Sequence, residues 1–143
     1  MHPVYTDEGS FLKSVLSISP QSIGSATATG AGVAQISGPG YYYNSAQLVI
    51  FAGAITGTPG TISIASQLQD SPDGSTLWAN FGAAMPLLAG AAAAANTSVA
   101  QNVQTRGCRG FLRLVAVVTL VTYTAVLVGG IIILGGASED PAI

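Results

Sequence analysis

Alternation of apolar and polar residues, interrupted by turn residues, is the main pattern along the chain. In residues 61–69, Ile62, Ile64 and Leu68 fall on one face and polar side chains fall on the other. A period of two residues is typical of a half-buried β-strand. Shorter runs with β-strand character, each followed by a turn that contains proline or glycine, cover residues 12–18, 22–29, 32–37 and 98–105.

The middle of the chain predicts a pair of hairpins. Residues 41–56 form a longer run whose central residues are apolar at consecutive positions, as in a strand that is covered on both faces. The segments 57–60 and 70–74 have the composition of turns, because proline fixes φ and glycine accepts a positive φ. We therefore expect residues 45–81 to form two consecutive hairpins, the second returning through Trp78.

The uncharged stretch at residues 114–134 has two interpretations. Its 21 residues are long enough to cross a bilayer as a helix, which would make the chain a tail-anchored protein. Against a helix, valine, isoleucine and threonine fill twelve of these positions, and such β-branched residues pack well in sheets. The apolar positions from Leu112 onward alternate with a set that includes Arg113, and Gly129-Gly130 interrupts the run. The pattern favours a strand, a turn and a second strand, with the membrane helix as the alternative.

The domain organisation follows from these patterns. A chain of 143 residues is long enough for one domain with a substantial core. Residues 1–10 lack periodicity and predict an extended arm, residues 11–136 a single all-β domain, and residues 137–143 a C-terminal tail. Residues 82–97 predict an apolar loop with one helical turn at most, because the alanines at 91–95 are too few for a stable helix. The first residues lack the features of a secretion signal, so we expect synthesis in a reducing cytosol.

Charge is scarce and unevenly placed. Charged residues make up 7% of the chain, against roughly 25% in an ordinary soluble domain. Residues 14–69, 74–105 and 114–138 contain none. A membrane protein, a disordered chain or a subunit of a large assembly would fit, but the 49% hydrophobic content argues against disorder. Nucleic acid is excluded as a partner, because four basic residues at a net charge of −2 neutralise few phosphates.

The residues that carry chemistry are too few for an active site. The single histidine, His2, lies beside a proline in the arm, so no base can be assigned to a hydrolytic triad. Arginines flank Cys108 and could lower its pKa, but without a histidine partner we interpret it as a buried or turn cysteine. Asp70 and Asp73 fall short of a calcium ligand set and predict a turn. We therefore expect no catalytic, cofactor or metal site, and no enzyme.

Two groups of residues are candidates for contact with a partner. Arg106, Arg109 and Arg113 hold three of the four basic residues, and they predict either a solvated edge or a docking patch for an acidic surface. At steps of two along a strand, Arg109 and Arg113 would share a face with the residue between them, Phe111. The second group, Tyr41, Tyr42 and Tyr43, predicts either a contact patch, because tyrosine is enriched at interfaces, or a half-buried strand start.

Five short motifs follow one another between residues 41 and 136. They are a turn of the GxITxG kind at Gly53–Gly57, an amphipathic strand at Thr61–Leu68, a hairpin of the Q-(D/E)-S-x-D-G-S-T-W kind at Gln69–Trp78, an arginine-flanked strand at Arg109–Leu114 and a terminal apolar strand that ends in Leu-Gly-Gly at Ile131–Gly136. In this order the motifs resemble those of small virion proteins of tailed bacteriophages. The chain departs from the pattern at Leu77, which separates Thr76 from Trp78.

The resemblance implies a fold and a function. It implies that residues 11–136 form an antiparallel β-sandwich of jelly-roll type that decorates and cements a capsid. Such a subunit binds over the joints between capsomers of the major capsid protein, as a dimer or trimer, on the exterior of the virion. It would be made in the cytoplasm of the bacterial host, would bind neither membrane nor nucleic acid, and would use residues 1–10 as a tether. A tail or head–tail joining subunit is the alternative virion component.

Overall fold

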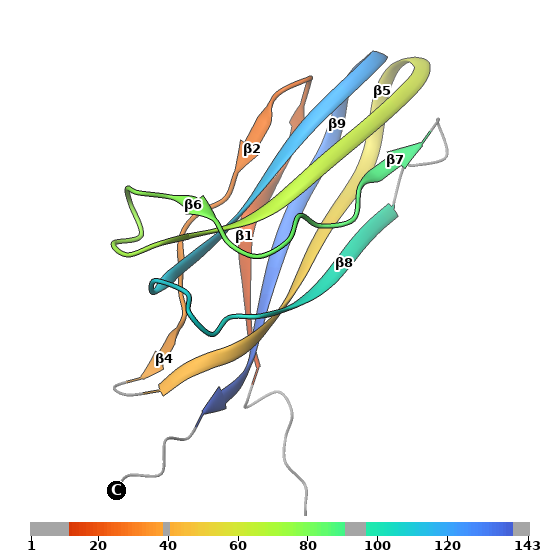
Figure 1. The fold of residues 1–143 in the computed structure, drawn as a ribbon. Helices are drawn as coiled ribbons and strands as arrows, with labels where there is room; N and C mark the ends of the chain where they lie inside the picture. Colours follow the sequence, from red (N-terminus) through yellow and green to blue (C-terminus); the bar gives the residue numbers. More distant parts are fainter. Residues whose placement is uncertain (1–11, 39–40, 91–96, 139–143) are drawn as a thin grey trace, which may run out of the picture.

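The computed structural model describes residues 12–38, 41–90 and 97–138, and all its regular elements are β-strands (Figure 1). Every strand pairing is antiparallel. The predicted all-β class is confirmed. The strands are β1 (Lys13–Ile23), β2 (Thr27–Thr29), β3 (Val33–Ala34), β4 (Ile36–Gly38), β5 (Tyr41–Ser71), β6 (Ala79–Asn80), β7 (Leu88–Gly90), β8 (Thr97–Gln104) and β9 (Phe111–Ser138).

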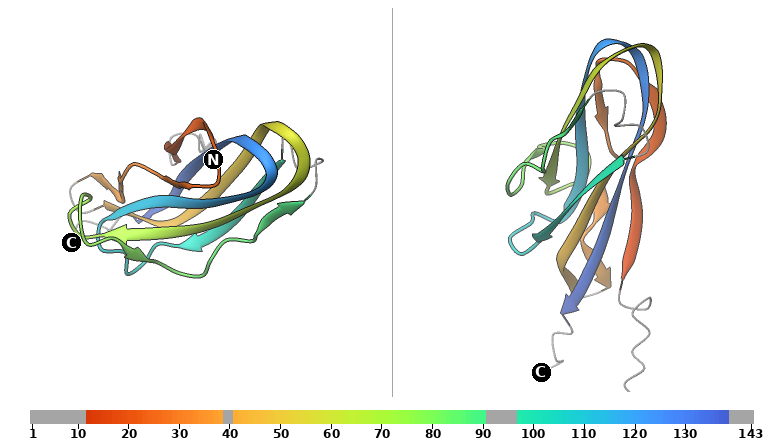
Figure 2. Two further views of the ribbon diagram at one scale, coloured as in Figure 1. Left: turned by 90° about the horizontal axis from the view of Figure 1, so that it is seen from above. Right: turned by 90° about the vertical axis from the view of Figure 1, so that its right-hand side faces the viewer.

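A long ribbon of β5 and β9 forms the frame of the molecule. The two strands pair along almost their whole length, from Tyr42 with Ser138 to Ser71 with Phe111. Both arch over at one end of the molecule (Figure 2), where the register shifts on either side of Gly57. Because of this bend, each of the two strands contributes one half to each of two facing layers.

The order of the other strands on this ribbon gives a jelly roll. The first layer runs β1, the second half of β9, the first half of β5 and β8. The second layer runs β2 with β3, the first half of β9, the second half of β5, and β6 with β7. Early segments thus pair with late ones all along the chain, as in a double-sheet jelly roll. The predicted jelly-roll-like sandwich is confirmed, whereas the arm at 1–10 lies outside the described residues.

The core lies between the two layers and follows the predicted alternation. Leu112, Leu114, Ala116 and Val118 of β9 are almost fully buried, whereas Arg113 lies on the outer face. In β5, the positions predicted to face inward at 62, 64 and 68 are buried as well. The largest fully buried side chains are Ile18, Leu48, Ile50, Ile64, Leu68, Leu112, Leu114, Ile132, Leu134, Val118, Val126 and Val128.

The first of the two predicted hairpins is wrong. Residues 41–56 and 61–71 do not pair with each other, because each segment pairs with a different half of β9. The turn at 57–60 instead carries the chain from one layer to the other. The second hairpin is confirmed, since Gln69 pairs with Asn80. Trp78, however, precedes the short return strand instead of lying inside it.

Residues 114–134 lie within β9, so the strand interpretation is confirmed and the membrane helix is wrong. The change of layer occurs at Thr122, which has a φ of 67°, and not at Gly129-Gly130. Gly129 lies inside the strand under the ring of Phe51, where a Cβ would come within 2.2 Å of the ring. The described residues contain no helix that is both long and apolar enough to cross a membrane.

The predicted loop at 82–97 contains a strand and no helical turn in its described part. Leu88 of β7 pairs with Ile64, and the side chains of Leu88 and Met85 close one side of the sandwich core. The alanines at 91–95 lie outside the described residues. Local composition did not predict β7, because this segment is extended only through its pairing with the neighbouring strand β5.

Candidate interaction site

Apart from Lys13 in β1, the charged residues of the described chain gather where two loops meet. One loop, residues 71–78, follows β5, and the other, residues 105–110, connects β8 to β9. We call these two loops together the loop end. Asp70 at the end of β5 and Arg109 in the second loop link them. The loop end and the bend of the β5–β9 ribbon lie at opposite ends of the second layer (Figure 1).

Arg109 clamps the two loops. Its Nη2 donates to Oδ1 of Asp70 at 2.7 Å and to the carbonyl of Leu77 at 2.9 Å. Its Nε donates to the same Asp70 oxygen at 3.0 Å, and its backbone N–H donates to the other carboxylate oxygen at 3.0 Å. The Asp70 side chain is 7% exposed and that of Arg109 39% exposed. The Asp70 carboxylate is therefore sheltered and bound through both of its oxygens, by the side chain and the backbone of Arg109, whereas the guanidinium itself remains partly in water. Such charge-assisted hydrogen bonds are stronger than neutral ones.

This contact sets the protonation of both partners. Burial by itself raises the pKa of Asp70, but the hydrogen bonds and the charge of Arg109 outweigh burial and hold the pKa below its ordinary value. In return, the hydrogen bond to Asp70 raises the pKa of Arg109. The pair stays ionised throughout the neutral range, so it cannot act as a general acid or base there.

The loop at 71–78 is ordered by a second carboxylate. Asp73 accepts hydrogen bonds from the backbone N–H groups of Ser75 at 3.0 Å and Thr76 at 2.7 Å, and from the hydroxyls of Thr76 and Ser71. These donors, with that of Thr76 foremost, hold the pKa of Asp73 well below its usual range. Asp73 therefore uses its oxygens inside this loop, as the turn interpretation expected, whereas Asp70, at the end of β5, uses its oxygens to bind Arg109 of the other loop. The described residues contain no group of three or more His, Cys, Asp or Glu side chains close enough to share a metal.

An aromatic stack covers the outer side of the loop end. The guanidinium of Arg113 lies 4.2 Å from the ring centre of Trp78, which is a cation–π contact. The Nη2 and Nε of Arg113 also donate to the amide oxygen of Gln69, at 2.8 and 3.0 Å. Burial lowers the pKa of Arg113, which nevertheless stays charged because an arginine is protonated at any physiological pH. The stack holds Trp78 flat against the second layer.

Beneath the loops, a buried amide ties three segments together. The Nε2 of Gln35 donates to the carbonyls of Tyr43 at 2.9 Å and Thr105 at 2.7 Å. The Thr105 hydroxyl donates to the same Tyr43 carbonyl, and the backbone N–H of Gln35 donates to Gly110 at 2.9 Å. Gln35 and Thr105 are both buried. The second loop is therefore fixed from below as well as from the side.

Of the three arginines in the predicted docking patch, only Arg106 can bind a partner without breaking a contact within the chain. It is exposed, and none of the described residues forms an ion pair or hydrogen bond with its side chain. Arg109 precedes β9 instead of sharing a strand face with Arg113 and Phe111, so that expectation is wrong. The three side chains lie at one end of the molecule, as expected, but Arg109 and Arg113 hold the loops in place.

Two tyrosines at the start of β5, Tyr42 and Tyr43, differ in their exposure. Tyr43 packs partly against the core, as a half-buried strand start would, whereas Tyr42 is 48% exposed. The side chain of Tyr41 lies outside the part of the chain that the structure describes. The half-buried strand start is therefore confirmed for Tyr43, and contact of Tyr42 with a partner stays a prediction.

Cys108 has the character of a turn residue. Its thiol is half-buried, accepts a hydrogen bond from the backbone N–H of Gly110 at 3.4 Å and lies 3.7 Å from the carbonyl of Phe111. Burial raises the pKa of the Cys108 thiol, and this outweighs the positive charge of Arg109. The lowered pKa considered from the flanking arginines is wrong, because desolvation is the largest effect on this thiol and the charge of Asp70 acts in the same direction. His2 lies outside the described residues.

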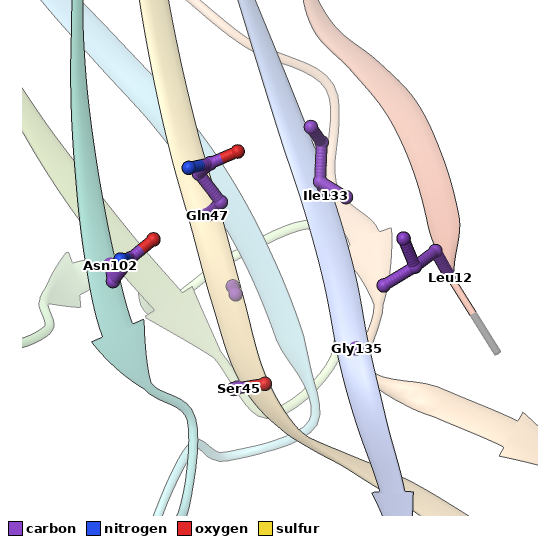
Figure 3. A pocket seen from close by; sticks show the side chains of 7 residues that line it. Leu12, Ser45, Gln47, Asn102, Ile133 and Gly135 are labelled. Atoms are coloured by element: carbon purple, nitrogen blue, oxygen red, sulfur yellow. The ribbon is translucent and has the colours of Figure 1, made fainter. Parts of the chain in front are cut away.

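A shallow hollow lies on the outer face of the first layer (Figure 3). It has a volume of about 300 Å³ and is lined by Leu12, Ser45, Ala46, Gln47, Asn102, Ile133 and Gly135. Its lining offers aliphatic carbon, one hydroxyl and two amides, with no charged group and no base that could activate the hydroxyl. Such a lining suits contact with another neutral protein surface better than turnover of a substrate.

Sequence reasoning missed the most unusual residue of the loop end. Leu77 has a φ of 54° and is 71% exposed, which is the largest exposure among the large hydrophobic residues of the described chain. A leucine carries no sequence signal for a positive φ, since glycine and asparagine are the residues that favour it. Its one signal was that it separates Thr76 from Trp78, which interrupts the phage-like hairpin pattern.

No protein-family model matches the chain, and no characterised protein matches its sequence.

Proposed function

We propose that this protein is a virion structural subunit that decorates and cements a phage capsid by binding over joints between capsomers of the major capsid protein. The proposal rests on the resemblance of residues 41–136 to phage virion proteins and on the jelly-roll sandwich. A fold alone does not imply a function, so the main support for this proposal comes from the outer surface of the sandwich.

The observation that supports this function best is the nearly uncharged outer surface of both layers. The strand segments of the first layer carry one charged residue, Lys13 at the start of β1, and those of the second carry Asp70 and Arg113 at the loop end. A free monomer ordinarily needs mixed charges all round for solubility. A subunit whose faces are covered by other proteins in an assembly does not need such surface charges.

Copies of the chain are the second partner in this proposal, as a dimer or trimer. The two edges of the first layer differ in how well they are protected. β1 carries Lys13, Pro20 and two register shifts, which are devices that discourage pairing with another strand. β8 has eight residues without charge, proline or glycine and an unbroken register, and no described strand pairs with its outer edge. β8 is the edge on which we expect a second copy.

Co-sedimentation tests the proposed function. The full chain is mixed with capsids purified from the phage that encodes it and stripped of this subunit, and the copies bound per major capsid protein are counted. We expect about one copy per capsid subunit, as trimers at local three-folds or dimers at local two-folds would give. A handful of copies per particle would indicate a tail or head–tail joining subunit instead. Absence of binding would remove the cement function.

A further inference from the structure

Leu77 occupies a backbone conformation that is unfavourable for leucine. Its φ of 54° lies in the left-handed region, which costs a residue with a Cβ roughly 1–2 kcal/mol relative to ordinary geometry. Glycine would adopt this φ without that penalty. The stability of the monomer alone therefore favours glycine at this position.

Within the monomer, burial of the leucine side chain offsets little of this conformational free energy. It is 71% exposed, so it buries little apolar surface against its own chain. Leu87, by comparison, is 59% exposed but has an ordinary negative φ. Leu77 thus combines strain with exposure, a combination that folding alone does not explain.

The loop holds Leu77 in place from several sides. Arg109 binds its carbonyl at 2.9 Å, Asp73 fixes the turn before it, and the next residue, Trp78, is stacked on Arg113. Strained residues persist only where the surrounding structure determines them, and they occur preferentially at binding sites. A side chain whose backbone is already ordered also loses less entropy when it binds.

We propose that Leu77 is the anchor of the capsid contact, inserting as an apolar knob into an apolar pocket of the major capsid protein. This inference deepens the proposed function and rests on it. The pocket must be apolar and deep enough for a leucine side chain, because the knob offers no hydrogen-bonding group. Bound there, Leu77 would bury the surface that the free subunit leaves in water.

The decisive variant is Leu77→Gly, because the proposal predicts opposite effects on stability and binding. Glycine removes both the strain and the knob. We expect an unchanged or raised thermal midpoint of the free subunit, together with a Kd for stripped capsids about 30-fold higher, as for a central anchor. Leu77→Asn, which also tolerates a positive φ, should behave in the same way.

Two controls separate the side chain from the backbone. Leu87→Asn removes another exposed leucine, and Thr122→Gly relieves the other described non-glycine residue of positive φ, at the bend far from the loop end. Both variants should bind capsids as the wild type does.

The outcomes distinguish the two proposals. If the wild type binds capsids and Leu77→Gly binds them equally well, the anchor is overturned and the cement function stands. A lower thermal midpoint for Leu77→Gly would also overturn the anchor, since it would show that the leucine stabilises the monomer. If the wild type does not bind at all, the cement function fails, and the capsid anchor fails with it.

Discussion

At the scale of single residues, four of the six charged side chains in the described part of the chain act within it. Asp70 and Arg109 bind each other, Asp73 orders its own turn, and Arg113 lies under Trp78. In a chain with so little charge, each of these groups has a defined structural role. The loop end is therefore the region whose stability should respond most to acid.

Asp70 gives a direct test of that response. Its pKa is lowered in the folded state, so its contribution is present above the ordinary carboxyl pKa of about 3.9 and is lost as the pH falls through the folded-state value. Asp70→Asn should cost roughly 1–3 kcal/mol at pH 7, because a sheltered hydrogen-bonded charge is lost while Arg109 can still reach water. Urea unfolding at pH 7 and pH 3 measures both effects. The wild type and the variant should differ less at pH 3, which lies below the ordinary carboxyl pKa, and an equal difference at both values would contradict the role of this carboxylate.

At the scale of elements, strand periodicity was predictable and strand partnership was not. The alternation around Ile64 and Leu114 gave the buried faces correctly, because a half-buried strand must repeat every two residues. The turn at 57–60 has the same composition whether the next strand returns beside the last one or crosses to the facing sheet. The hairpin expectation failed there because the partner, β9, lies far along the chain.

The candidate site shows the same limit. The turn at 70–74 was evident from its aspartates, proline and glycine, which act on their immediate neighbours. The stack of Trp78 on Arg113 and the bond from Gln35 to Thr105 join residues that only the fold brings together. Leu77 was unpredictable for the opposite reason, since its local preference is against the conformation it adopts.

The unprotected edge of β8 gives a prediction at this scale. Ala100 is exposed on the outer face at the middle of the strand, so Ala100→Lys should leave the fold intact and place a charge where a second copy would pair. We expect the variant to shift the subunit toward the monomer in sedimentation equilibrium. Ser14→Lys on the already protected edge of β1 is the matched control and should leave the association unchanged. Equal effects of the two lysines would argue against β8 as the contact edge.

At the scale of the whole molecule, the distribution of charge distinguishes two ways in which the proposed capsid subunit would bind. A docking patch made of Arg106, Arg109 and Arg113 would bind an acidic surface through charge. An apolar anchor at Leu77 between nearly uncharged faces would bind through buried area. The structure leaves only Arg106 of the patch without an internal partner, which weakens the first alternative.

Salt separates these alternatives on the intact particle. The Debye length falls from about 10 Å at 0.1 M salt to about 3 Å at 1 M, so contacts between exposed charges weaken strongly over this range. Burial of apolar surface does not depend on that screening. We expect the Kd for stripped capsids to change less than about threefold between 0.1 and 1 M NaCl, and Arg106→Ser to change it equally little. A steep loss of affinity with salt, reproduced by Arg106→Ser at low salt, would instead establish the arginine patch as the docking surface, because only a contact made by exposed charge is sensitive to both changes.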